Sequence, residues 1–482
     1  MLFDFCSNAQ DLMHRRHFLH AAGSLLLGCS SRARTDSMVD AGLDAVQDAN
    51  PISTSLPSVD AAIDASGETR DATADAAMDA APVDAGISDE EARKAQREVF
   101  PAWDGRRDSV SPVTMLMFRG NLRRNFHGTG VLPREPVLKW KYRLGTLHID
   151  RAGEDTRHWT GTGWTGQAVK WGQRIFVGGL DGKFYCWDAF SGKVIWTLKT
   201  ERMFKSSPCF YDERLYVGNV DNKFRCIDAR TGKLVWSHDM RGDCDSSPVV
   251  ADGILYAASE SGFLHALDPR SGGHHFKLDL GGHRGPGGSQ GIESSPVIDG
   301  DELWIGTYDG FLYRIDRIQG KVLAKMPTGD DTDATPVVTD DYVFAAAEQK
   351  NPVLSCFERK TGTLKWSFKD RGGFWSTPAI VNGKVYIGGD DAHLYCLDEH
   401  TGKQIWSFAA RRAIWSSPSV VDGKVIFGSY DGFLYMVDAL TGHLIWQVDL
   451  GGPVLSTACI VDGHIWIGSG DGQFYCFGPP NT

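Results

Sequence analysis

Several signatures of redox and hydrolytic enzymes are missing from this chain of 482 residues. It contains no Cys-x-x-Cys-His haem motif, no paired cysteine and histidine spacing typical of zinc sites, and no two adjacent cysteines. A glycine-rich phosphate loop leading into a helix and a recognisable serine–histidine–aspartate arrangement are also lacking. The sequence therefore offers no motif for the common haem, zinc, nucleotide or acyl-transfer chemistries.

Long apolar runs are equally scarce. The stretch 18–28 has eleven residues, too few to span a bilayer. It follows Arg15 and Arg16, which resemble a twin-arginine export motif, and it ends in Leu-Leu-Gly-Cys29, which resembles a lipobox. We therefore expect 1–29 to be a signal peptide and Cys29 to carry a lipid anchor. Ser30 after the cysteine favours the outer membrane as the destination of an exported, lipid-anchored protein.

Aromatic residues are absent between residue 30 and Phe100, where Asp and Ala dominate. A segment of this composition, without aromatic residues, cannot form a core, so we predict that 30–98 is a disordered tether. Residues 30–100 hold 15 acids and 6 bases, a charge of −9 out of the −11 of the whole chain. The remainder is close to neutral, and we expect no nucleic-acid partner.

A repeat of about 40 residues dominates the rest of the chain. Its clearest copies run from Asp391 to Trp406 and from Asp431 to Trp446, and both follow a Ser/Thr-Pro pair and a short apolar run. Each unit contains three runs rich in β-branched and aromatic residues, separated by turns, and a fourth run with one recurrent position. This pattern predicts a four-stranded antiparallel meander. The recurrent position holds Trp196, Trp236, Phe276, Ala324, Trp366, Trp406 and Trp446.

The two ends of the repeat region complement each other. The last unit, 456–477, has three strands, and the segment 137–144 supplies a fourth run with Trp140 at the recurrent position. Radial stacking of such sheets covers both faces of each one. We therefore predict an all-β fold over 99–482: an eight-bladed β-propeller of four-stranded antiparallel blades, closed by pairing of the N-terminal strand with the last blade.

The units resemble the PQQ-like, quinoprotein-type propeller repeat, with the pattern Leu-Tyr-x-Leu-Asp-x-x-Thr-Gly-x-x-x-Trp. The segment 118–121 (Phe-Arg-Gly-Asn), followed by Gly128 and Pro136, resembles the lead-in of such propellers. This resemblance covers about 118–477 and is specific for the fold, not for the function. It implies either a dehydrogenase that holds PQQ and calcium at the channel or a BamB-like envelope lipoprotein that assists outer-membrane protein assembly.

Candidate site residues lie where the innermost strand of each blade begins, near the central channel. Three acids follow a lysine on consecutive blades, and three of the other four positions are tryptophans. Two interpretations stay open: a ligand site in which carboxylates hold a cation and indoles stack on a flat group, or a rim in which acids pair with loop arginines. No particular metal is indicated. The column reads Trp164, Lys205, Asp245, Glu293, Asp333, Trp375, Trp415 and Leu455.

The resemblance favours binding over catalysis. Quinoprotein dehydrogenases carry adjacent cysteines and long insertions, and this chain has neither. We therefore predict a non-catalytic, lipid-anchored envelope propeller, a monomeric ring without a cofactor. It would act as a scaffold for envelope proteins or peptides, including outer-membrane protein assembly, or as a ligand receptor. The alternatives are a PQQ- and calcium-dependent dehydrogenase with a reduced site and, from the tryptophans, a carbohydrate-binding propeller.

The histidines and cysteines do not indicate a metal site in the sequence. His274, His275 and His283 lie close together without metal-site spacing, and we expect them to be solvated loop residues. Five cysteines share one position on the predicted third strand of different blades, where we expect buried apolar side chains. They are Cys186, Cys226, Cys356, Cys396 and Cys476.

Overall fold

The computed structural model describes residues 114–145, 166–280, 291–348, 352–369 and 372–480. The predicted signal peptide with Arg15, Arg16 and Cys29 lies outside the described residues, and so do the predicted tether and Trp164. Among the residues that are described, there is no helix with the length and apolarity needed to cross a membrane.

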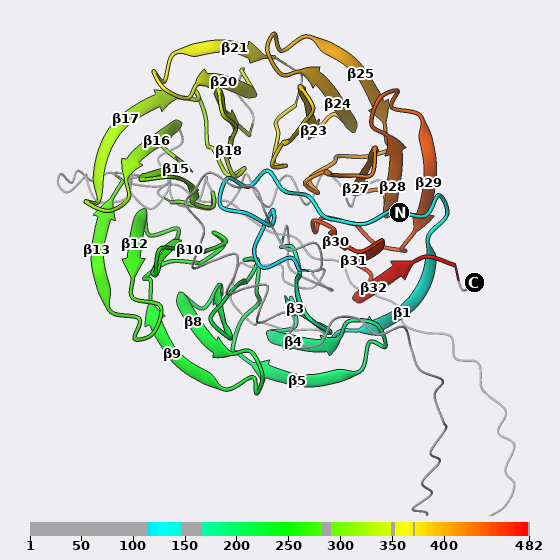
Figure 1. Ribbon diagram of the computed structural model, residues 1–482, viewed down its shortest axis with the longest axis horizontal. Coiled ribbons are helices and arrows are strands. Elements are labelled where there is room, and N and C mark those ends of the chain that lie inside the picture. The colour runs from blue at the N-terminus through cyan, green and yellow to red at the C-terminus, as the bar shows by residue number, and fades with distance from the viewer. Residues whose placement is uncertain (1–113, 146–165, 281–290, 349–351, 370–371, 481–482) are drawn as a thin grey trace, which may run out of the picture. The chain divides into compact units, whose positions relative to one another are not determined.

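Eight four-stranded antiparallel sheets are arranged in a ring, as the repeat predicts (Figure 1), and the space enclosed by their inner strands is called the channel. Seven of these blades use four consecutive strands, the inner strand coming first in the chain. Blades 1 to 4 are β2 (Val169–Trp171), β3 (Arg174–Gly178), β4 (Lys183–Asp188) and β5 (Val194–Lys199); β6 (Cys209–Tyr211), β7 (Arg214–Gly218), β8 (Lys223–Asp228) and β9 (Leu234–Asp239); β10 (Val249–Ala251), β11 (Ile254–Ala258), β12 (Phe263–Leu267) and β13 (His274–Asp279); and β14 (Val297–Asp299), β15 (Glu302–Thr307), β16 (Phe311–Asp316) and β17 (Lys321–Pro327).

The second half of the ring repeats this plan. Blades 5 to 7 are β18 (Val337–Val338), β19 (Tyr342–Ala346), β20 (Leu354–Glu358) and β21 (Leu364–Phe368); β22 (Ala379–Val381), β23 (Lys384–Gly388), β24 (His393–Asp398) and β25 (Gln404–Ala409); and β26 (Ser419–Val421), β27 (Lys424–Gly428), β28 (Phe433–Asp438) and β29 (Leu444–Asp449). Blade 8 has β30 (Cys459–Val461), β31 (His464–Gly468) and β32 (Gln473–Gly478).

The ring closes through β1 (Val137–Arg143), which is the outer strand of blade 8. Its sheet has the order β1-β32-β31-β30, with Trp140 opposite Cys476 and Val137 opposite Gly478. The indole Nε1 of Trp140 donates to the carbonyl oxygen of Ala189 in blade 1 at 2.9 Å. The predicted closure by the N-terminal strand is therefore confirmed.

The turn before each outer strand shows why the repeat has its sequence. In blade 7, Asp438 Oδ1 accepts hydrogen bonds from the backbone N–H and the hydroxyl of Thr441 at 2.8 and 2.9 Å. Gly442 then adopts a φ of 73°, and a Cβ at this position would come within 2.6 Å of the Trp406 ring of blade 6. Glycine is needed there both for the backbone angle and for the close approach of the indole.

The core lies between blades, where the apolar faces of neighbouring sheets meet. Tyr216 and Phe224 of blade 2, for example, share one buried cluster with Val249 and Leu255 of blade 3. The recurrent tryptophans bridge the same interfaces: Trp236 Nε1 donates to the Pro269 carbonyl oxygen of blade 3 at 3.1 Å. The eight cysteines in the described part of the chain are buried and form no disulfide, which confirms the burial predicted for five of them.

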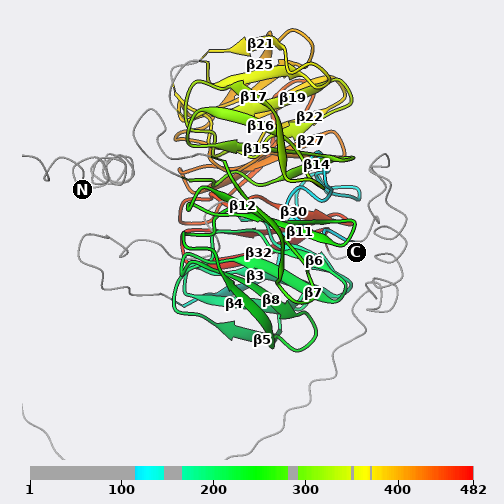
Figure 2. The same ribbon diagram turned by 90° about the vertical axis from the view of Figure 1, so that its left-hand side faces the viewer.

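A segment ahead of the first blade, Thr114–Leu132, lies across one end of the channel and is called the lead-in here (Figures 1 and 2). Its backbone bonds to inner strands of several blades. Met115 exchanges two bonds of 3.0 and 2.8 Å with Lys170, and Ile298 donates to Leu122 at 2.9 Å. Thr129 donates to the Ile460 carbonyl oxygen at 3.2 Å. The lead-in thus connects blades that are far apart in the ring.

Two buried arginines extend these connections. Arg124 donates to the carbonyl oxygens of Phe118 at 2.7 Å and of Ser247, Pro248 and Pro296 at 3.1 Å. Burial lowers the pKa of this arginine to about 10, so the guanidinium stays charged at neutral pH. It is therefore bound by carbonyl dipoles from blades 3 and 4 and from the lead-in itself.

Arg119 has the same role on the opposite side of the channel. It donates to the carbonyl oxygens of Thr377 and Pro418, each at 2.6 Å, and contacts His127 Nδ1 at 2.6 Å. Burial lowers its pKa to about 9. Blades 6 and 7 are therefore joined to the lead-in by a second charged group.

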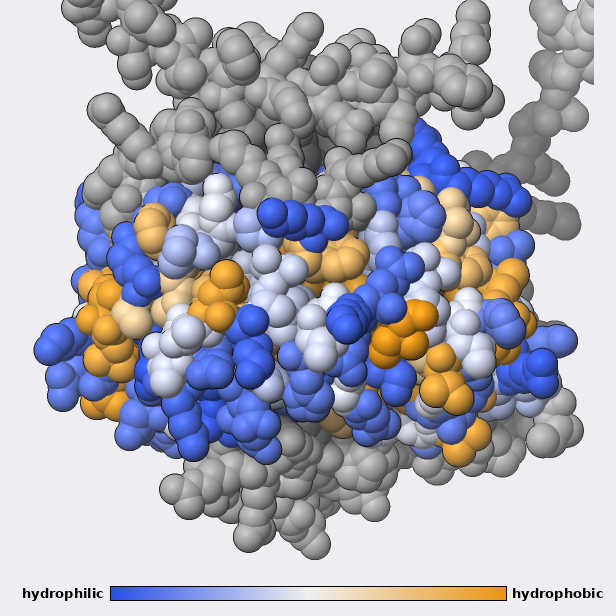
Figure 3. Space-filling view, turned by 90° about the horizontal axis from the view of Figure 1, so that it is seen from above, coloured by the Kyte–Doolittle hydropathy of each residue, from blue (hydrophilic) through white to orange (hydrophobic). Residues whose placement is uncertain are grey.

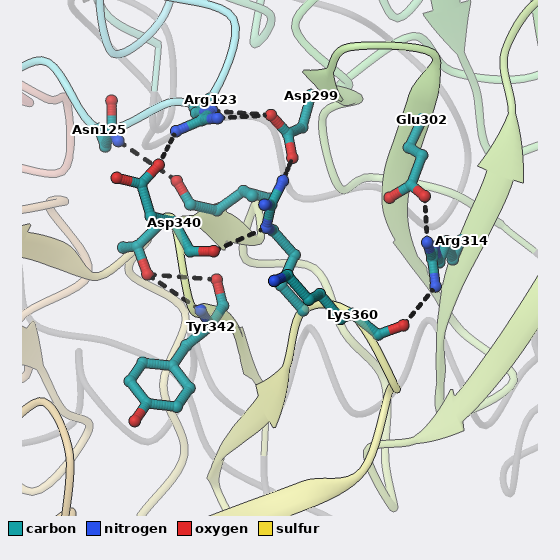
Figure 4. A network of polar contacts seen from close by, with 11 residues as sticks. Arg123, Asn125, Asp299, Glu302, Arg314, Asp340, Tyr342 and Lys360 are labelled. Atoms are coloured by element: carbon teal, nitrogen blue, oxygen red, sulfur yellow. Dashed lines mark hydrogen bonds and ion pairs between the residues drawn. The ribbon is translucent and has the colours of Figure 1, made fainter. Parts of the chain in front are cut away.

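An ion-pair network completes the attachment at the surface (Figure 4). Arg123 pairs with Asp299 and Asp340, each at 2.7 Å, and Arg359 also pairs with Asp299. Asp299 and Asp340 lie in or beside the turns that follow the inner strands of blades 4 and 5. These turns define the lead-in face of the ring, and the opposite ends of the same strands define the other face.

Candidate ligand site at the channel mouth

The predicted column lies at the channel mouth away from the lead-in. Each member precedes an inner strand, and the inner strand then runs toward the lead-in face. The structure describes seven of the eight positions, all partly or fully buried: Lys205, Asp245, Glu293, Asp333, Trp375, Trp415 and Leu455. The polar members occupy blades 2 to 5 and the apolar members blades 6 to 8, so the mouth has an acidic half and an indole half.

A buried ion pair begins the acidic half. Lys205 Nζ lies 2.6 Å from Asp245 Oδ2, and the two side chains are 13% and 7% exposed. Burial raises the pKa of Asp245 to about 6, although the ammonium of Lys205 acts in the opposite direction and Glu293 adds to the rise. The other oxygen of Asp245, Oδ1, is buried without a hydrogen-bond partner among the described residues. This oxygen is available to a ligand.

A second column, which sequence reasoning missed, interleaves with the first. It follows the second strand of each blade, immediately before the turn residue that is Asp in most blades. Blades 1 and 2 have apolar residues at this position and blade 8 has Gly470, whereas blades 3 to 7 have groups that can bind protons or metals. These members are Glu260, Tyr308, Glu348, Asp390 and Tyr430.

Three carboxylates converge between blades 3 and 4. Asp245, Glu260 and Glu293 each present an oxygen within 4.8 Å of the others, and the Tyr308 hydroxyl donates to Glu293. Burial, followed by the charges of Glu293 and Asp245, raises the pKa of Glu260 well above its usual range. Oxygen ligands in this arrangement suit a hard cation such as Ca²⁺, and a bound cation would relieve their mutual repulsion.

A carboxyl pair continues the acidic half into blade 5. Asp333 and Glu348 are joined by a hydrogen bond, and burial raises the pKa of both, that of Glu348 to about 8. The hydrogen bond raises the pKa of Asp333 and lowers that of Glu348, while burial and neighbouring carboxylates raise the pKa of both. At neutral pH the pair therefore holds at least one proton that an exposed pair would have lost.

The indole half is filled by its own side chains. Trp375 and Trp415 stack with ring centroids 4.8 Å apart and an interplanar angle of 15°. Tyr430 meets Trp415 edge to face at 4.5 Å, and Trp415 Nε1 donates to Asp390 Oδ1 at 2.6 Å. Burial raises the pKa of Asp390 to about 6. One face of each stacked indole is thus covered by the other.

The alternative interpretation, in which the acids pair with loop arginines, can be compared only with the described arginines, since Arg284 and Arg371 lie outside the described residues. Within the described ranges, the ion-pair partner at this mouth is Lys205, and no arginine pairs with Asp245, Glu293 or Asp333. Arg411 instead lies 4.9 Å from the Phe433 ring. The ligand site at this mouth, and the ligand itself, therefore stay predictions.

The residues at this mouth fit a cation better than PQQ. The carboxylates supply oxygen donors, and one of these oxygens, Asp245 Oδ1, has no hydrogen-bond partner in the described part of the chain. For a flat cofactor, however, the stacked Trp375–Trp415 pair already occupies the indole platform, and the adjacent cysteines typical of quinoprotein dehydrogenases are absent. We therefore derive no chemistry through PQQ.

The fold and the channel site define an eight-bladed propeller of the PQQ-like class. A family model described as "Outer membrane protein assembly factor BamB" matches residues 140–368 and 350–462, and the chain belongs to this family. No curated protein sequence matches the chain.

Solved structures share the fold at low sequence identity. BamB from Moraxella catarrhalis is 18% identical with a TM-score of 0.57, covering 72% of this chain and 98% of its own. A quinohemoprotein alcohol dehydrogenase from Comamonas testosteroni is 14% identical with a TM-score of 0.65, covering 82% and 85%. A europium-containing methanol dehydrogenase is also 14% identical, with a TM-score of 0.62, covering 81% and 100%. At these identities the likeness concerns the fold alone.

Proposed function

We propose that this chain is a non-catalytic envelope scaffold that binds other envelope proteins or peptides during outer-membrane protein assembly. Export through Arg15 and Arg16 and lipidation of Cys29 would anchor it to the outer membrane. Membership of the BamB family supports the proposal. The observation that carries it is the row of exposed apolar residues on the outer edge strands.

These edge strands are built for pairing with extended chains. Each outer strand is hydrogen-bonded on one side and leaves its other backbone edge unpaired within its sheet. The first residues of several outer strands are apolar and exposed: Leu234 and Val235 of β9 are 49% and 44% exposed. Figure 3 views the ring from the side and shows orange patches among the blue surface. The same kind of residue recurs as Val194, Ile195, Leu323, Leu364, Ile405 and Leu444.

A peptide added to such an edge gains main-chain hydrogen bonds, and its alternate side chains gain apolar contact. Unfolded segments of outer-membrane β-barrels alternate apolar and polar residues and therefore match this surface. Because the edges recur around the ring, one ring offers several weak sites to one long chain. A ring with repeated edge sites suits holding an unfolded chain, with no chemical step required.

The edge-strand prediction can be tested with a denatured transmembrane β-barrel protein diluted into the full chain. We expect a complex in sedimentation, and we expect Leu234→Lys with Val235→Lys to weaken binding about two- to threefold, because two ammonium groups replace the apolar contact at one of several sites. Ser237→Lys, also exposed on β9, adds one charge without removing apolar surface and serves as the control. Equal binding by all variants would contradict the proposal.

A second candidate, the PQQ- and calcium-dependent dehydrogenase, is favoured by the carboxylates at the channel mouth. Calorimetric titration of PQQ with calcium into the full chain separates the two functions. We expect no PQQ binding, because the stacked indoles fill the platform. Binding at micromolar Kd or tighter that is lost in a variant with alanine at Asp245, Glu293 and Asp333 would overturn the scaffold proposal.

A further inference from the structure

Three histidines meet at the interface between blades 2 and 3, away from the channel mouth. His238 comes from β9, His265 from β12 and His274 from β13, and each offers a ring nitrogen within 4.8 Å of the others. His265 Nδ1 lies 2.9 Å from His274 Nε2. The ring centroid of His238 lies 4.6 Å from that of His274 and 5.5 Å from that of His265.

We infer that these three histidines form a binding site for a divalent transition-metal ion of the zinc class. Zinc takes imidazole nitrogens at about 2.0–2.1 Å, which places tetrahedral ligand atoms about 3.3 Å apart. Small rotations of three side chains bring nitrogens within 4.8 Å to that spacing. A site with three protein ligands keeps a fourth position for water, and the exposure of His274 gives an ion access from solvent.

The repeat makes this cluster stand out, because other blades have different residues at the same positions. The position of His238 holds Leu198 in blade 1 and Leu278 in blade 3, and the position of His274 holds Val194 in blade 1. The position of His265 holds tyrosine in most blades, for example Tyr395. Other blades of this propeller therefore pack without histidine at any of the three positions. Histidines from two blades coincide at this interface, so packing alone does not account for them.

The environment of the three imidazoles is compatible with a metal. His265 is 1% exposed and its Nδ1 faces His274 Nε2, so an ion at the cluster would replace this contact. Burial lowers the pKa of all three histidines, that of His265 to about 3. Neutral imidazole is the form that binds metal ions, and at pH 7 protons therefore compete weakly.

The charged groups near the cluster act in opposite directions. Lys277 lowers the pKa of His265 and His274 and would repel a cation, but its Nζ lies over the Phe263 ring, 3.6 Å from the centroid. Asp239, next to His238, raises the pKa of that histidine and would attract a cation. The imidazoles, with nitrogen donors, favour zinc-class ions over calcium, which prefers oxygen.

A bound ion would join blade 2 to blade 3. His238 lies on the outer strand of one sheet, and its two partners lie on adjacent strands of the next. Coordination would therefore add a metal bridge to an interface that also has apolar contacts and hydrogen bonds, among them those of Trp236 and Tyr216 to the Pro269 carbonyl oxygen. This role is independent of the channel mouth and of the edge strands.

Zinc titration of the full chain tests the inference, with excess Ca²⁺ present to occupy the carboxylates. We expect one site with a micromolar or lower Kd, a zinc-dependent rise in Tm, and visible absorption bands of tetrahedral Co²⁺ when cobalt replaces zinc. His238→Leu with His274→Val copies residues of other blades and leaves the buried His265 in place. This variant should fold and lose the site, raising Kd more than about 100-fold.

His443→Gln is the matched control, since His443 is exposed in a turn of blade 7 and should leave zinc binding unchanged. The single exposed change His274→Val provides a second variant should the double one be unstable, and it should also weaken binding. Zinc affinity that is equal in the wild type and both variants would overturn the inference, as would a cobalt spectrum of purely octahedral type.

Discussion

Replacing Arg124 with alanine is expected to lower the free energy of unfolding by about 3–5 kcal/mol. The guanidinium is fully buried and donates to carbonyl oxygens of Phe118, Ser247, Pro248 and Pro296. Alanine would leave these oxygens buried without donors and create a cavity between the lead-in and two blades. Lysine keeps the positive charge but lacks the planar guanidinium that donates in several directions. Arg124→Lys should therefore recover only part of the lost free energy of unfolding.

Urea unfolding followed by tryptophan fluorescence measures this effect. Arg134→Ala changes an exposed arginine shortly after the lead-in, and it should cost less than about 0.5 kcal/mol. A loss below about 1 kcal/mol for Arg124→Ala would mean that the lead-in lies on the ring without stabilising it.

Glu348→Gln is expected to stabilise the ring by about 2–4 kcal/mol at pH 9 and to have little effect at pH 4. Burial raises the pKa of Glu348 to about 8, whereas an unfolded chain titrates near 4.5. Between these values the unfolded chain releases a proton that the folded chain retains, so wild-type stability falls as pH rises from 4.5 to 8. Glutamine is uncharged at every pH and removes this fall.

Thermal unfolding across pH 4 to 9 checks the prediction. The difference in stability between Glu348→Gln and the wild type should grow through this window and then stay constant. Glu201→Gln, at an exposed loop position, is the control and should show no such trend. Calcium added at pH 9 should narrow the difference, because a cation near the carboxylates favours their ionised form. A difference that does not change with pH would show that Glu348 is not held protonated.

The propeller could be predicted because the same turn and strand patterns recur in successive units of the sequence. The turn built from Asp438, Thr441 and Gly442 recurs in most blades, and β-branched runs separated by such turns leave few alternatives. Trp140 could be assigned to the last blade because its unit lacked one strand. The buried lead-in arginines were not predicted, since their partners are backbone carbonyls, which every residue possesses.

The channel site was predicted only in part. Asp245, Glu293 and Asp333 could be found because a Ser/Thr-Pro pair marks the start of each inner strand. Glu260 and Glu348 lie at a position that holds a different residue type in successive blades, so no pattern marked them. The second column could have been found by aligning the turn that follows the second run of each repeat, whether or not that turn is Asp-Gly.

The histidine cluster shows a further limit. His238 belongs to blade 2, whereas His265 and His274 belong to blade 3, and their separations along the chain match no metal motif. His274 was interpreted as a loop residue but begins the strand β13. Contacts between neighbouring blades depend on how two sheets pack, which the spacing of residues in one repeat does not encode.

The pairing of β1 with β32 has a consequence for biosynthesis. β32 is flanked by β31 on one side and by β1 on the other, so the end of the chain lies between two earlier segments. While a ribosome is still translating, β1 has no partner, and a chain that stops before Gln473 leaves the ring open. An unfinished product therefore exposes unpaired strands on both sides of the gap, where chaperones and proteases can recognise it. Synthesis of β32 is thus the step that allows the ring to close.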